Sequence, residues 1–285
     1  MGDEERHASP NRPSPRRHGE EAANRGPYGS GGKMSLGEAL LEQAARLLAD
    51  ARLLVVFTGA GVSRESGIPT FRDPIEGVWA RYDPLRMATL DGYLQDPPLV
   101  WRWYEHRFGI VAGAHPNAGH IAIAELEQVL PRVVVVTQNI DGLHQRAGSS
   151  EVIELHGSMH RFKCLSGHHA GLTRADFAGQ TEQPPRCSLC GELLRPDVVW
   201  FGEVLPEDAL AAAFRLARAC DVMLVAGTSG IVHPAASVPL LAAQAGTPVI
   251  DVNPEPDELA RSATICLRGP SGEVLPRLLQ RLADT

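Results

Sequence analysis

The fold is decided by one stretch, LLVVFTGAGVSRESGIP at residues 53–69, in which an apolar run passes directly into a glycine-rich loop. The apolar run predicts a buried strand. The loop places glycines at Gly59, Gly61 and Gly67, but the usual dinucleotide fingerprint would want a small residue at Arg64. The loop therefore predicts either free backbone amides that cradle a phosphate or a plain tight turn.

Outward from this stretch, strand-like and helix-like patterns alternate along the chain. Three further apolar runs stand at 133–137, 222–227 and 248–253, and helical patterns lie at 121–130 and 206–220. This alternation predicts a parallel sheet with covering helices, an α/β fold. Since ligands collect at the carboxyl ends of such strands, the polar residues that follow each run are the candidates for chemistry.

The domain organisation follows from composition. Residues 1–34 are rich in charge, Pro, Gly and Ser, so we expect a disordered tail. Order is expected to begin at Ser35, which with Glu38 has the form of a helix capping box. Two stretches break the strand and helix alternation at 72–116 and 159–195, and we expect them to form a smaller domain. The remaining residues of the catalytic domain 35–285 are 35–71, 117–158 and 196–285.

Charge and hydropathy limit the kinds of partner. A net charge of −7 gives no general attraction to nucleic acid or to an anionic membrane. The chain has no run of 18 apolar residues and no secretory leader pattern. Its five cysteines, an odd number, argue against a disulfide framework. We expect a cytoplasmic monomer that binds neither nucleic acid nor membrane.

Polar side chains follow the second strand-like run. Gln138, Asn139 and Asp141 would be poor core, so they either cap a helix or bind a polar ligand. Capping would explain Asp141 alone. Further on, His156 precedes a glycine; it is either a structural histidine or a general base, because its ordinary pKa lies near neutrality.

A cysteine group lies in the second inserted stretch. Cys187 and Cys190 have the spacing of a zinc knuckle, and Cys164 would be a third ligand. A glycine stands where a fourth cysteine is usual, so His168 or His169 could supply the last ligand, and our predicted set takes His168. The expectation is one structural Zn²⁺ per chain; the alternative is a degenerate site without metal.

Together these motifs resemble the sirtuins, in that family's order along the chain. The motifs lie at 59–72, 137–144, 155–157, 187–196, 198–203, 227–229 and 253–255. The resemblance implies an NAD-dependent protein-lysine deacylase with a Rossmann-like parallel sheet, helices on both faces, and a small domain made of a zinc ribbon and a helical insertion.

The resemblance also implies roles for residues. Those that hold the NAD phosphates would be Gly59, Ala60, Gly61, Ser63, Phe71 and Arg72. Those around the nicotinamide and its ribose would be Gln138, Asn139, Ile140 and Asp141. Those on the adenosine side would be Gly227, Thr228, Ser229, Asn253, Pro254, Glu255 and Cys266.

In the family's mechanism nicotinamide is released and the acyl group leaves on ADP-ribose. The resemblance implies that His156 is the general base for the ribose hydroxyls, with Asn139 and Asp141 as the other catalytic residues. The segment Val199, Trp200, Phe201 and Gly202 would hold the acylated lysine segment as an added strand, with Trp200 exposed.

The nature of the acyl group is suggested by Tyr104 and Arg107, which share a face if they lie on a helix. This pair resembles the one that marks class III sirtuins, which remove succinyl and malonyl groups, because an Arg fork can hold a distal carboxylate. The alternatives are a broad deacetylase in which the pair is incidental, a sirtuin-fold mono-ADP-ribosyltransferase, and a non-catalytic sensor of NAD or ADP-ribose.

Overall fold

A computed structural model of the protein describes residues 35–70 and 83–285. Residues 35–285 form one compact unit. The expected tail at 1–34 lies outside the described residues, as do two predicted phosphate ligands, Phe71 and Arg72. Among the described helices, none has both the length and the apolar character needed to cross a membrane.

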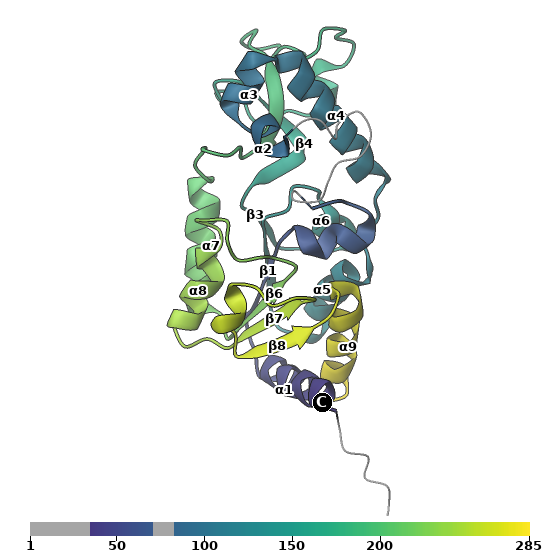
Figure 1. The fold of residues 1–285 in the computed structure, drawn as a ribbon, viewed down its shortest axis with the longest axis vertical. Helices are drawn as coiled ribbons and strands as arrows, with labels where there is room; N and C mark the ends of the chain where they lie inside the picture. The colour runs from purple at the N-terminus through teal and green to yellow at the C-terminus, as the bar shows by residue number, and fades with distance from the viewer. Residues whose placement is uncertain (1–34, 71–82) are drawn as a thin grey trace, which may run out of the picture. The chain divides into compact units, whose positions relative to one another are not determined.

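A six-stranded parallel sheet lies at the centre of the fold (Figure 1). Strand β1 lies between β2 and β6 in the order β3-β2-β1-β6-β7-β8. In register, Thr58 at the end of β1 is opposite Thr137 on one side and Ala226 on the other. The bounds are β1 Leu54–Thr58, β2 Val133–Thr137, β3 Val152–Glu154, β6 Val222–Ala226, β7 Val249–Asn253 and β8 Ile265–Arg268.

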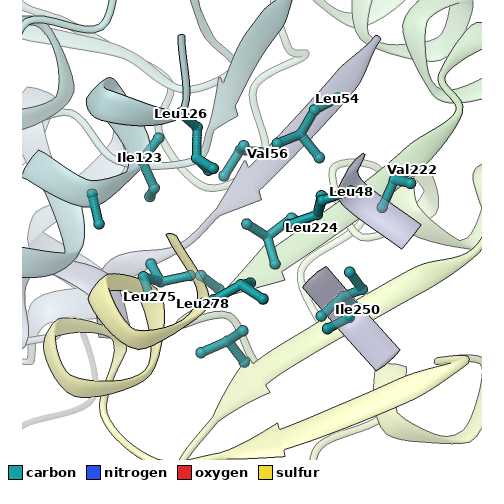
Figure 2. Packing of buried hydrophobic residues seen from close by; sticks show 14 of the residues in the cluster. Leu48, Leu54, Val56, Ile123, Leu126, Val222, Leu224, Ile250, Leu275 and Leu278 are labelled. Atoms are coloured by element: carbon teal, nitrogen blue, oxygen red, sulfur yellow. The ribbon is translucent and has the colours of Figure 1, made fainter. Parts of the chain in front are cut away.

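Helices cover both faces of this sheet because the side chains of each strand alternate. Leu54 and Val56 of β1 pack against α1, α5 and α9, whereas Val55 and Phe57 pack against α7 and α8. Figure 2 shows the first of these cores. Full burial of a side chain such as Leu48 or Leu278 contributes about 1.5–3 kcal/mol. The helices are α1 Leu36–Ala49, α5 Ala118–Val129, α7 Glu207–Ala219, α8 Ser237–Gln244 and α9 Ser271–Ala283.

The start of α1 follows the predicted cap only in part. The Ser35 hydroxyl accepts a hydrogen bond from the backbone N–H of Glu38 at 3.2 Å. The Glu38 carboxylate does not return the bond as a capping box would; it pairs with Arg277 and Arg281 of α9. The first helix is thereby fixed to the last one.

The described parts of the two stretches that break the alternation, 83–116 and 159–195, pack together in a second layer beside the six-stranded sheet. It contains a two-stranded antiparallel sheet of β4 and β5, beside an aromatic core that includes Tyr93, Trp103 and Trp200. Its elements are α2 Pro84–Met87, α3 Leu90–Gln95, α4 Pro97–Gly113, β4 Gly157–Cys164, η3 Arg174–Phe177 and β5 Leu194–Val198. The predicted α/β class, with a parallel sheet and helices on both faces, is confirmed.

Candidate active site

The glycine-rich loop after β1 forms a 3₁₀ helix, η1 (Ala60–Ser66), packed tightly against the loop after β6. A Cβ atom on Gly61 would lie 2.7 Å from the carbonyl oxygen of Gly227, and one on Gly59 would lie 2.8 Å from Cβ of Thr228. The N–H of Gly61 donates to Gly227 at 2.7 Å, and that of Gly59 donates to Ala226 at 3.1 Å. The amides of these two glycines are therefore not free, so the first of the two alternatives does not hold for them. A glycine is required at both positions because the two loops touch.

Behind this loop, three predicted residues meet in one buried network. The Ser63 hydroxyl donates to the carboxylate of Asp141 at 2.7 Å and accepts from the Asn139 amide at 3.1 Å. The Asn139 amide also donates to the carbonyl of Gly59 at 3.1 Å. All three polar side chains are at most 7% exposed. Since buried polar groups in a closed network are held in one orientation, Asn139 is left with its amide oxygen to offer to a ligand.

Two histidines that the sequence analysis did not assign complete the wall of this network. The rings of His120 and His144 are 4.9 Å apart, and burial lowers their pKa values to about 4 and about 3. His144 Nε2 lies 2.9 Å from the hydroxyl of Thr58, which donates onward to Thr137. Both histidines are therefore neutral at physiological pH. The signal that could have found His120 is a polar residue on the buried face of a helix.

His156 is fixed in the form that a general base requires. Its Nδ1 lies 2.9 Å from the carbonyl oxygen of Gln138, and because a carbonyl can only accept, Nδ1 carries the proton. Nε2 is then unprotonated, and its lone pair can accept a proton. Burial lowers the pKa of His156, against the opposing effect of that hydrogen bond, so the ring is neutral at pH 7. The Gln138 side chain donates to the hydroxyl of Thr228 at 2.9 Å.

The residues predicted for the adenosine side lie at the ends of β6 and β7. The amide of Asn253 donates to Asp251 at 2.6 Å and to Asp257 at 2.7 Å, so its carbonyl oxygen is left to accept from a ligand. An open depression of about 570 Å³ adjoins these strand ends, and Ser229 is part of its wall. The other lining residues are Ile231, Pro256, Asp257, Glu258, Ala260 and Arg261.

The remaining predicted residues around the cofactor differ in exposure. Pro254, Glu255 and Ala60 are exposed, and Ile140 is half-buried. Cys266 is half-buried in β8, and its thiol lies 3.8 Å from the carbonyl oxygen of Ala260 in the wall of the depression.

The cysteine group is assembled, with one change to its predicted members. His169, not His168, faces the thiols: its Nδ1 lies 3.9 Å from Sγ of Cys164 and 3.7 Å from Sγ of Cys187. Ligand atoms of Cys164, His169 and Cys190 all lie within 4.8 Å of one another. His168 is exposed, and its backbone N–H donates to the hydroxyl of Ser166 at 3.5 Å. We therefore correct the fourth position to His169.

These distances fit a zinc ion. With Zn–S of ~2.3 Å and Zn–N of ~2.0 Å, tetrahedral ligands place sulfur and nitrogen about 3.5 Å apart. Three thiols and one imidazole are also one of the donor sets that hold structural zinc.

Tyr104 and Arg107 share one face of α4, as the spacing predicted. Burial raises the pKa of Tyr104 to about 12, and Arg107 opposes this shift, so the hydroxyl is protonated and lies within electrostatic range of the guanidinium. Burial also lowers the pKa of Arg107, although an arginine remains charged. Its guanidinium carbon lies 5.1 Å from the ring centroid of Trp103. The pair is therefore a buried hydroxyl beside a half-buried cation.

The segment predicted to bind the substrate strand differs from expectation at Trp200. Its indole is 1% exposed and lies in the aromatic core, whereas Phe201 is 47% exposed. The backbone N–H groups of Val199 and Phe201 donate to His156 and Ala88, both at 2.9 Å. The expectation of an exposed Trp was wrong, because α4 covers this side of the segment. Phe201 and Gly202 are the exposed members of the set.

Comparison with known proteins adds independent findings. A model described as the Sir2 family matches residues 59–234. NAD-dependent protein deacylase 2 of Pyrobaculum aerophilum is 51% identical over 238 residues, which are 84% of this chain and 94% of the relative.

Two solved structures are also similar. The crystal structure of a Sir2 homologue in complex with NAD has a TM-score of 0.79 and 45% identity, and the match covers 85% of this chain and 94% of that one. A Sir2 protein bound to a myristoylated histone peptide has a TM-score of 0.70 and 36% identity, with 87% and 98% covered.

Proposed function

The chain belongs to the Sir2 family, and from that premise we propose that it is a deacylase of protein lysines that prefers acyl groups ending in a carboxylate to the acetyl group. NAD-dependent lysine deacylation itself is the activity of this enzyme. The preference rests on one observation: Tyr104 and Arg107 are three residues apart on one face of α4, with the Tyr104 side chain buried and Arg107 half-buried.

The physical reason is the difference between the two acyl ends. A guanidinium can donate two parallel hydrogen bonds to a carboxylate, and such charge-assisted bonds contribute about 1.5–3 kcal/mol each. An acetyl methyl group can accept no hydrogen bond, so Arg107 and Tyr104 would gain nothing from it.

For the cosubstrate, the arrangement supports specific roles. NAD, when bound, supplies the ADP-ribose that accepts the acyl group, with release of nicotinamide. His156 would take a proton at Nε2 from a ribose hydroxyl. Asn139 would orient the nicotinamide end through its amide oxygen, and Asp141 would hold Ser63 in place. The loop after β6 and Asn253 would bind the adenosine side.

For the zinc, the role is structural. Cys164, His169, Cys187 and Cys190 would hold one ion, which joins the β4 end to the knuckle at 187–190. None of the described titratable groups that we assign to catalysis contacts this group, so the ion would stabilise the fold without joining the reaction.

Acylated lysine peptides are the substrates. That they bind as an added strand is part of the proposal, and the exposed ring of Phe201 beside the exposed Gly202 supports it. A net charge of −7 supports the further expectation that nucleic acid is not a partner. We also keep the expectation of a monomer.

The test is nicotinamide release from NAD with acetyl-lysine and succinyl-lysine peptides of one sequence. We expect kcat/KM for the succinyl peptide to exceed that for the acetyl peptide, and Arg107→Met to lower this ratio about 10–100-fold. Arg102→Met is the matched control, since Arg102 is an exposed arginine on the same helix, and it should leave the ratio unchanged. His156→Ala should abolish deacylation of both peptides. A wild-type preference for acetyl would contradict the proposal.

A further inference from the structure

Trp200 was predicted to be an exposed contact for the substrate strand, and that role does not explain why its indole is buried. Its indole Nε1 donates a hydrogen bond to the Tyr104 hydroxyl at 2.8 Å, across 96 residues of sequence. An indole N–H is a donor only, so at this contact the Tyr104 oxygen must accept.

This contact sets the direction of the remaining hydrogen bond of Tyr104. A phenol hydroxyl can accept or donate, and a site built to hold a carboxylate needs it to donate. With one lone pair of the oxygen occupied by Trp200, the single O–H proton of Tyr104 is directed to another acceptor. The hydroxyl remains protonated throughout the working pH range, since burial raises its pKa to about 12.

The indole itself packs against two further side chains. The guanidinium carbon of Arg195 lies 3.3 Å from the Trp200 ring centroid, and the Tyr93 ring lies 5.3 Å away. Arg195 is fixed in turn by hydrogen bonds to the Glu203 carboxylate and to the carbonyl of Val198. The Trp200 backbone N–H donates to the same Glu203 carboxylate at 2.9 Å. The indole N–H is therefore a rigid donor.

We propose that Trp200 is a positioning residue for acyl selectivity: it fixes the Tyr104 hydroxyl as a hydrogen-bond donor to the carboxylate of an acidic acyl group. This assignment rests on the proposed preference for such groups. It differs from contact with the peptide, because Trp200 acts through Tyr104.

The experiment uses the full chain with Trp200→Phe, Tyr104→Phe and the double variant. In each variant the acetyl peptide is the internal reference for any change in packing. We expect Trp200→Phe to lower the ratio of succinyl to acetyl kcat/KM about fivefold, the value of one neutral hydrogen bond, through a higher KM for the succinyl peptide. In the Tyr104→Phe background, Trp200→Phe should change the ratio no further.

The outcomes separate this assignment from the proposed function. If the wild-type enzyme favours the acetyl peptide, both the proposed acyl preference and the assignment to Trp200 are overturned. If wild type favours succinyl and Tyr104→Phe lowers the ratio while Trp200→Phe does not, only the assignment to Trp200 is overturned. Equal effects of Trp200→Phe with and without the Tyr104 hydroxyl also overturn it, because they indicate a role in packing alone.

A second variant guards against misfolding of Trp200→Phe. Benzothienyl-alanine placed at position 200 has nearly the shape of tryptophan but carries sulfur in place of N–H. It should lower the selectivity ratio by the same factor while acetyl turnover reports an intact fold. An unchanged ratio in this variant would overturn the assignment.

Discussion

Replacing Glu203 with Gln tests the ion pair that supports the aromatic core, in which the Arg195 side chain is buried and the Glu203 side chain is 26% exposed. The Glu203 carboxylate accepts hydrogen bonds from both terminal nitrogens of Arg195 and from the backbone N–H of Trp200. Arg195 is 2% exposed, and its Nε has no partner among the described residues. Glu203→Gln therefore leaves a buried guanidinium without its counter-charge while changing the side-chain volume little.

The size of the effect follows from burial. Removing one partner of a buried pair costs about 3–5 kcal/mol, and we expect the lower end because Gln keeps one acceptor oxygen. For a unit of this size a loss of ~3 kcal/mol corresponds to a Tm lower by about 6–12 °C. Burial alone would raise the pKa of Glu203, but the hydrogen bonds from Arg195 and Trp200 lower it overall. The pair's contribution is thus complete above pH 4.5 and lost as pH falls through the lowered pKa, so unfolding is measured at pH 7.

Urea unfolding of wild type and variant supplies the free energies, with Glu182→Gln as the matched control. Glu182 pairs with Arg186 at 3.0 Å, but the two side chains are 57% and 51% exposed. An exposed pair contributes about 0–1 kcal/mol, so the control should unfold almost as wild type does. Equal losses in the two variants would refute the argument that burial makes the Arg195 charge depend on Glu203.

The remaining predictions concern His156 and the zinc ligands. Because burial lowers the pKa of His156 and the neutral ring is the base, kcat/KM should be flat through neutral pH and fall only below pH 6.5; a fall beginning above pH 7 would contradict this. His169→Ala should weaken zinc binding by more than the ~10–100-fold that loss of a supporting hydrogen bond costs, whereas the neighbouring His168→Ala should not. Zinc retained by each purified variant after dialysis against a chelator measures this. Loss of zinc from His168→Ala but not from His169→Ala would return the assignment to His168, and equal retention would contradict the assignment to His169.

Much of the sheet could be predicted, because its information is local. Each of the apolar runs at 133–137, 222–227 and 248–253 became a parallel strand, since a strand buried on both faces is apolar throughout. Strand β8 was missed because its residues, Ile265–Arg268, are few and end in a charge. The network of Ser63, Asn139 and Asp141 follows from the register that brings the ends of neighbouring strands together.

The errors concern contacts between distant segments. Nothing in the local sequence of Trp200 indicates that α4 will cover its indole. The choice between His168 and His169 depends on how the chain turns after β4, because the side chains of two adjacent residues point in different directions. The glycines at 59 and 61 indicated that something lies close to the backbone there. The segment that lies close is a loop more than 160 residues away in the sequence, which local patterns do not identify.

The bond between Trp200 and Tyr104 has a consequence during synthesis of the chain. A ribosome that adds about 5–20 residues per second makes Trp200 roughly 5–19 s after Tyr104, since 96 residues separate them. For that interval the aromatic face of α4 has no partner from β5 or from the segment that follows it. Nascent chains stalled before residue 194 should therefore expose a surface that chaperones bind, and chains long enough to free Trp200 from the ribosome tunnel should lose it.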